Sequence, residues 1–108
     1  MTTEELDLIE VSNKAAKEAV AKGEALKRLM ENEDYKMVVV DGYTNEYPKA
    51  LGEAIAKNTG EYDTDKLIDI LKSINGYVGY TFQVSGNYHA ALQTLADNAD
   101  YVANSDRE

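Results

Sequence analysis

The chain of 108 residues contains no cysteine and no tryptophan, and it has one proline, one phenylalanine and one histidine. The absence of cysteine excludes disulfides, thiolate metal sites and a thiol nucleophile. The single histidine, His89, would need carboxylates from elsewhere in the chain to complete a metal site, so a packing or surface role is favoured for it. Composition therefore argues against an enzyme, and we expect no catalytic residue, metal or cofactor.

Two short patterns resemble parts of catalytic or metal sites but are incomplete. Asp63 and Asp65 have the spacing of the first two ligands of a calcium loop, but the glycine and the closing glutamate of that loop are missing. Ser85 and His89 are four residues apart, without the sharp turn or the oxyanion donors of a hydrolase. We interpret the first pair as acidity at a helix N-terminus and the second as helix packing.

Charged residues are absent from Ser73 to Ala96, a stretch of 24 residues in a chain that is 29% charged. Asn75, Gln83 and Asn87 make the stretch too polar to cross a membrane. A solvated surface normally mixes charges of both signs. We therefore expect this stretch to contact protein on most of its sides.

The chain is acidic, with a formal net charge of −9. Phosphate backbones and anionic lipids repel such a chain, so we expect no direct binding of nucleic acid and no membrane contact. The first ten residues lack the basic region and the apolar run of a secretory signal. We expect the partner to be another protein.

The N-terminal part predicts a long helix over about residues 3–31. Thr2 and Glu5 have the spacing of a capping box, in which the side chain of each residue accepts a hydrogen bond from the backbone N–H of the other. Asn13 and Gly23 lie on the face of the apolar stripe, which consists of Leu6, Ile9, Ala16, Val20, Leu26 and Met30.

The middle of the chain, about residues 33–58, predicts one or two short helices. Asn32 suits an N-cap, Pro48 suits a first helical turn, and Gly60 suits a left-handed stop. Residues 37–40 form a run rich in β-branched side chains, before Asp41-Gly42, which by local propensity favours a strand and a turn. A helix in this run remains the alternative.

The last part predicts a helix over about residues 64–103. The spacing of its seam alternates four and three residues, as in a coiled coil, through Leu67, Leu71, Ile74, Val78, Thr81, Ser85, Tyr88, Leu92, Leu95, Ala99 and Val102. Such a helix is about 58 Å long at 1.5 Å per residue. It needs the N-terminal helix or a second chain to cover its seam.

Three glycines, Gly76, Gly79 and Gly86, oppose this helix, and a hairpin between Tyr77 and Tyr88 is the alternative. Each glycine costs roughly 1 kcal/mol in a helix. Each large apolar side chain buried on the seam returns about 1.5–3 kcal/mol. We therefore favour the helix, in which glycines on a packed face would let a neighbouring helix approach closely.

Two segments, residues 25–43 and 67–98, resemble a group of small helical tailed-bacteriophage proteins. The matching positions are Leu26, Leu29, Asn32, Asp34-Tyr35-Lys36, Val39, Gly42-Tyr43, Leu71, Ile74 and Tyr77. His89 departs from the pattern, since it stands where the group has a small residue and Ala90 comes one place later.

The resemblance implies an all-α protein encoded with head or virion genes and located in the virion or the host cytoplasm. It also favours a helix over a strand at residues 37–40. It transfers no catalytic residue, because the matching positions are packing positions.

Together these observations predict a single all-α domain over residues 1–108, in which the two long helices form an antiparallel hairpin with the short helices between them. We predict a phage structural or assembly protein that self-associates or binds a capsid or connector component. The predicted interface on the last helix is Leu71, Ile74, Tyr77, Val78, Tyr80, Phe82, Val84, Tyr88, Leu92 and Leu95.

Three amides of the uncharged stretch, Asn75, Gln83 and Asn87, would fix the register of that interface, since an unpaired buried amide is costly. Tyr77, Tyr80, Phe82 and Val84 would form its face opposite the seam. The alternative function is an acidic phage-encoded inhibitor of a host enzyme, which would imitate the charge of DNA.

Overall fold

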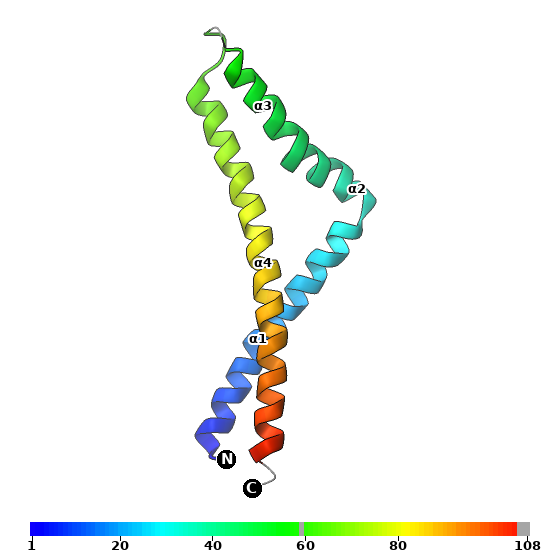
Figure 1. The fold of residues 1–108 in the computed structure, drawn as a ribbon, viewed down its shortest axis with the longest axis vertical. Helices are drawn as coiled ribbons and strands as arrows, with labels where there is room; N and C mark the ends of the chain where they lie inside the picture. Colours follow the sequence, from blue (N-terminus) through cyan, green and yellow to red (C-terminus); the bar gives the residue numbers. More distant parts are fainter. Residues whose placement is uncertain (59, 106–108) are drawn as a thin grey trace. The chain divides into compact units, whose positions relative to one another are not determined.

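The computed structural model describes residues 1–58 and 60–105, and every element within these ranges is a helix (Figure 1). The elements are α1 (Thr3–Glu31), α2 (Glu33–Tyr35), the π-helix η1 (Lys36–Glu46), α3 (Tyr47–Ala56) and α4 (Thr64–Ser105). The all-α prediction and the long helices at both ends of the chain are therefore confirmed. The alternative with a hairpin between Tyr77 and Tyr88 is wrong, because both residues lie inside α4.

The chain divides into two compact units. Unit 1 combines Met1–Leu26 with the described residues from Gln83 onward, and unit 2 is Lys27–Phe82. Helix α4 contributes its first part to unit 2 and its second part to unit 1. That these residues form a single domain stays a prediction.

Side-chain caps begin the helices where the sequence predicts them. The backbone N–H of Glu5 donates to the Thr2 hydroxyl at 3.1 Å, and the Thr2 N–H donates to the Glu5 carboxylate at 3.2 Å, which completes the capping box. Asn32 accepts from the Tyr35 N–H at 2.9 Å. Asp63 accepts from the N–H groups of Asp65 and Lys66 at 3.1 and 3.4 Å and so caps α4.

A loop between α3 and α4 is organised by Asn58, which the sequence analysis did not single out. Its amide oxygen accepts from the N–H groups of Gly60 and Tyr62, while its amide nitrogen donates to the Tyr62 carbonyl and the Thr64 hydroxyl. Gly60 has φ +98°, the left-handed conformation predicted for it. One amide therefore satisfies several backbone and side-chain groups of this turn.

The strand that local propensity favours at residues 37–40 is absent, and the helical alternative is confirmed, because these residues lie in η1. The π-helix is continuous with α2 before it and α3 after it, so the backbone groups of the β-branched run are paired within a helix. In its wider turns, a Cβ on Gly42 would lie 3.3 Å from the Met37 carbonyl oxygen. Pro48, in the first turn of α3, has no N–H to donate and is tolerated there.

Unit 2 has a small core of aliphatic and aromatic side chains. Ile74 of α4 is only 1% exposed, and Leu51 of α3 is also buried. The ring of Tyr43 meets the ring of Tyr77 edge to face at a centroid distance of 5.8 Å. This geometry is favourable for aromatic pairs and joins η1 to α4.

In unit 1, α1 and α4 approach each other closely at Gly23 and Tyr88. A Cβ placed on Gly23 of α1 would overlap the Cβ and the ring of Tyr88 of α4. Ala16 and Ala91 are buried in the same unit. Small side chains on both helices therefore let the two backbones come together, with Tyr88 as the large side chain between them.

The seam of α4 differs from the predicted one at alternate positions. Ser85, Leu92 and Ala99, predicted on the seam, are exposed. A seam whose positions are all partly or fully buried alternates three and four residues instead: Leu67, Ile70, Ile74, Tyr77, Thr81, Val84, Tyr88, Ala91, Leu95, Asn98 and Val102. Leu71 and Val78 of the predicted seam are partly buried beside it. The short distance between helices in unit 1 admits Ala91 and leaves the larger Leu92 outside.

Two further expectations about α4 are corrected by this arrangement. Val84, expected on the face opposite the seam, is buried. Gly76, Gly79 and Gly86, expected on a packed face, are exposed, and a Cβ on any of them would meet nothing within 4 Å among the described residues. The glycine that permits close packing within the chain is Gly23.

We predict that Gly23→Ala lowers the free energy of unfolding by about 1–3 kcal/mol, since the added methyl group collides with Tyr88. Urea unfolding followed by circular dichroism measures the change. Gly52→Ala in α3 is the control, because a Cβ there meets nothing within 4 Å, and it should raise stability by up to about 1 kcal/mol. A Gly23→Ala variant at least as stable as the native chain would contradict the close approach.

Candidate interaction surface

The ten residues predicted as an interface have different environments in the structure. Ile74, Val84 and Tyr88 are buried within the chain. Leu71, Tyr77, Val78 and Leu95 are partly buried. Tyr80, Phe82 and Leu92 are exposed. Only the last three offer a large exposed apolar surface, so the candidate surface for a partner is smaller than the predicted interface.

In unit 2, the exposed part of the uncharged stretch centres on Tyr80 and Phe82. Tyr80 is 54% exposed and Phe82, the only phenylalanine, is 73% exposed. Gly76 and Gly79 precede them on α4 and are exposed as well. Exposed aromatic side chains beside bare backbone are typical of surfaces that bind protein.

In unit 1, the exposed part of the uncharged stretch is more polar. Leu92 is its large apolar member, and Gly86, Asn87, His89 and Ala90 are exposed near it. The His89 ring meets the Tyr88 ring edge to face at 5.3 Å. The amides predicted to fix register, Asn75, Gln83 and Asn87, are exposed, so they do not perform that task within the chain.

Asn98, which sequence reasoning missed, makes polar contacts between the two helices of unit 1, and the Tyr101 hydroxyl donates to the Glu5 carboxylate at 3.5 Å. The Asn98 amide nitrogen donates to the Asn13 side-chain oxygen at 2.8 Å and to the Ser12 hydroxyl at 3.2 Å. Asn13 was predicted on the seam-facing side of α1, but its partner on α4 was not predictable from spacing. Such a contact favours one register of the helices over its neighbours.

A second apolar surface in unit 1 was also missed, and it lies on α1. Leu8 and Val11 are 71% and 69% exposed, although they are large aliphatic side chains. Beside this stripe, a groove between α1 and α4 is lined by small side chains, among them Ala15, Ala90 and Thr94. The spacing of Leu8, Val11 and Ala15 was the available signal in the sequence.

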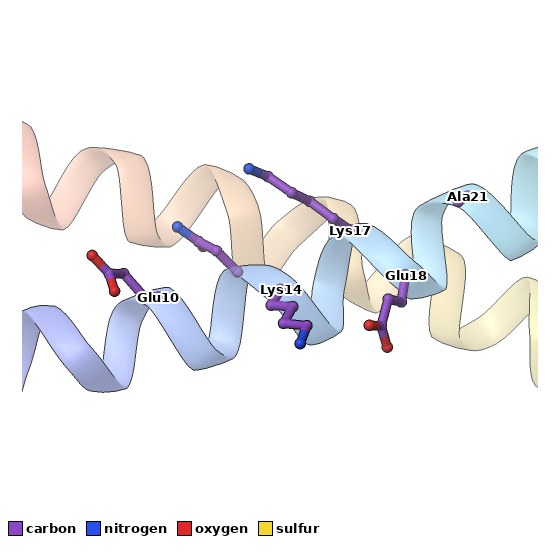
Figure 2. Close-up of a pocket in the computed structure, with 6 residues that line it drawn as sticks. Glu10, Lys14, Lys17, Glu18 and Ala21 are labelled. Atoms are coloured by element: carbon purple, nitrogen blue, oxygen red, sulfur yellow. The ribbon is translucent and has the colours of Figure 1, made fainter.

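A shallow depression on the outer side of α1 offers little to a small ligand. It is lined by side chains of this one helix, Glu10, Asn13, Lys14, Lys17, Glu18 and Ala21. Figure 2 shows that the amino groups of Lys14 and Lys17 point away from each other. Binding pockets need converging polar groups, so we assign no ligand to this place.

Within residues 1–58 and 60–105, no group of three or more histidine, aspartate or glutamate side chains is placed to hold a metal ion. Among the same residues, no helix is both long and apolar enough to cross a membrane. Asp63, considered for calcium, instead caps α4.

Comparison with protein-family models, with curated proteins and with solved structures found no match to this chain.

We predict that Asn98→Ala lowers the free energy of unfolding by about 1–2 kcal/mol, since it leaves the side chains of Ser12 and Asn13 without this donor. Thermal and urea unfolding measure the effect. Asn104→Ala, an exposed position on the same helix, serves as the matched control and should change stability by less than about 0.5 kcal/mol. Equal stability of both variants would show that Asn98 does not hold the two helices together.

Proposed function

We propose that this chain is a non-enzymatic assembly protein of bacteriophage particles, which associates with itself or with a capsid or connector component through the exposed, uncharged surface of α4. The proposal rests on the exposure of that uncharged surface. The surface includes Phe82, 73% exposed, in a chain with a net charge of −9. The class of protein we infer is therefore a helical protein-interaction module.

Electrostatics supports self-association at this place. Two copies of a chain with nine excess negative charges repel each other wherever their carboxylates approach. Between Ser73 and Ala96 there are no carboxylates, so contact there avoids direct repulsion between neighbouring charges. The stretch spans about 36 Å of helix at 1.5 Å per residue, which is long enough for a helix-packing interface.

The exposed glycines also favour the uncharged surface of α4 as the place where a partner binds. Gly76, Gly79 and Gly86 together cost roughly 3 kcal/mol of helix stability relative to alanine. Within the described part of the chain, nothing packs against them. A partner helix that crosses α4 at these positions would approach its backbone closely, and this contact would offset the cost.

The association with phage particles rests on the resemblance of residues 25–43 and 67–98 to small tailed-bacteriophage proteins. It is an analogy of context, since those positions serve packing and no chemistry. The proposal includes the antiparallel hairpin of α1 and α4 and a location in the virion or the host cytoplasm. It includes no enzymatic activity, no cofactor and no direct contact with nucleic acid or membrane.

The first test is Phe82→Asp, which places a charge in the uncharged surface. We predict that light scattering at high micromolar concentration gives an oligomer for the native chain and a lower mass for this variant. Tyr62→Asp is the control, since Tyr62 is 56% exposed outside the stretch, and it should keep the native mass.

Two results would count against self-association through α4: a native chain that is monomeric, or a Phe82→Asp variant with the native mass. Partner binding that weakens steeply with added salt would instead favour an acidic inhibitor that imitates DNA charge. Association through uncharged residues should change little with salt.

A second prediction concerns the particle. If the chain takes part in assembly, mass spectrometry should detect it in purified particles or procapsids of the phage that encodes it. The major capsid protein of the same preparation is the positive control. Absence of the chain from both mature particles and assembly intermediates would overturn the virion assignment.

A further inference from the structure

Helix α1 has an exposed stripe that its packing in unit 1 leaves uncovered. Leu8 and Val11 are three residues apart and therefore lie on the same side of the helix. Ala15 and Ala19 continue that side at intervals of four residues. The buried residues of α1, Ala16 and Gly23, border this stripe on the side that faces α4, and Leu8 and Val11 themselves are exposed.

Next to the stripe lies a groove made of two hollows between α1 and α4, which share Ala15 and Asn87. The first is also lined by Glu18, Ala19, Lys22 and Val84, and the second by Ser12, Ala16, Ala90, Ala91 and Thr94. All these residues lie in unit 1. The surface thus has two large aliphatic side chains at one end and a shallow groove beside and beyond them. A large side chain from outside would find space in the groove.

The charges along the stripe have opposite signs at its two ends. Glu4 lies one turn before Leu8 on the same side of the helix, and Lys22 lies at the far end of the groove, where it contributes to the lining. Glu18 lies one turn before Lys22 and lines the same end. The order from the N-terminus is an acid, two large apolar residues, an alanine, a second acid, an alanine and a base.

The two ends of this order are complementary when it is read against itself in reverse. In an antiparallel contact centred near residue 13, Glu4 lies opposite Lys22 of a second copy, and Val11 lies opposite Ala15. Leu8 lies opposite Glu18, at the hollow that Ala15, Glu18, Ala19 and Lys22 line. Val11 therefore meets a small residue and each charged end meets its opposite, as an isologous twofold interface requires.

We propose that a second copy of this chain docks antiparallel on the α1 stripe, with Leu8 and Val11 of each copy in the groove of the other. The two symmetric pairs of Glu4 with Lys22 set the register. The inference rests on the proposed self-association, but it places the twofold contact on α1 and the adjoining wall of α4 instead of around Phe82.

The size of the surface suits a small interface between copies. From Glu4 to Lys22 the stripe is about 28 Å long, and two packed helices are roughly 20 Å wide, which gives a flat area of about 560 Å². Accessible area exceeds flat area because side chains corrugate the surface, and a stable interface needs about 800 Å² per partner. The charge complementarity selects a second copy over a different protein.

The test uses two charge reversals, Glu4→Lys and Lys22→Glu, and sedimentation equilibrium of the full chain. In each variant alone, both symmetric pairs become like-charged, so dimerisation should weaken by roughly tenfold or more. In an equimolar mixture, the two different variants should pair with each other, because both cross-chain contacts are then between opposite charges. Native mass spectrometry identifies that heterodimer.

Two matched controls lie on another side of α1. Glu10→Lys and Lys17→Glu make the same changes in net charge, and both positions belong to the outer surface shown in Figure 2. Each should dimerise within about twofold of the native chain, since neither position lies on the stripe. A variant that had lost its fold would not recover in the mixture, so recovery separates the interface from folding.

The outcomes separate this inference from the proposed function. Weakening by both reversals, with recovery in the mixture, supports the α1 contact. A mixture that dimerises no better than the separate variants overturns it, and so does a native chain that is monomeric at high micromolar concentration. If Phe82→Asp abolishes association while the reversals have no effect, the α4 surface stands and the α1 contact is wrong. If the reversals weaken dimerisation while Phe82→Asp has no effect, the α1 contact stands and the α4 placement is wrong.

Discussion

The close approach of α1 and α4 at Gly23 is the constraint on which the rest of unit 1 depends. Because the backbone at Gly23 lies against Tyr88, neighbouring positions on both helices must be small, and Ala16 and Ala91 occupy them. The same closeness brings Asn98 within hydrogen-bonding distance of Ser12 and Asn13. It also determines which side of each helix stays outside and can meet another protein.

The exposed part of the uncharged stretch of α4 and the apolar stripe of α1 both lie outside the buried positions of their helices. On α4, the buried seam takes one side of the stretch, and Tyr80 and Phe82 remain exposed. On α1, the small residues next to the core continue outward into a groove, while Leu8 and Val11 stay exposed beside it. Both surfaces are apolar or uncharged in a strongly acidic chain, where carboxylates elsewhere oppose contact between copies.

Sequence reasoning succeeded where the deciding interactions are local. The Thr2 and Glu5 capping box, the Asn32 cap and the left-handed Gly60 each depend on residues within a few positions of one another. At residues 37–40 local propensity alone favoured a strand, and the helical alternative formed, because a helix that continues on both sides outweighs the preference of β-branched side chains for strands. Sequence reasoning missed Asn98, because the partners of this residue are 85 and 86 positions away.

The sequence by itself determined the helices, their limits and the lack of charge along α4, since these depend on propensity, capping and composition. Only the tertiary structure decided which residues of α4 face α1. Spacing allows Leu92 on the seam as readily as Ala91, and size favours Leu92, yet Ala91 is the buried one. The distance between two helices selects between such neighbours, and that distance is set by Gly23 and Tyr88, which lie 65 residues apart in the chain.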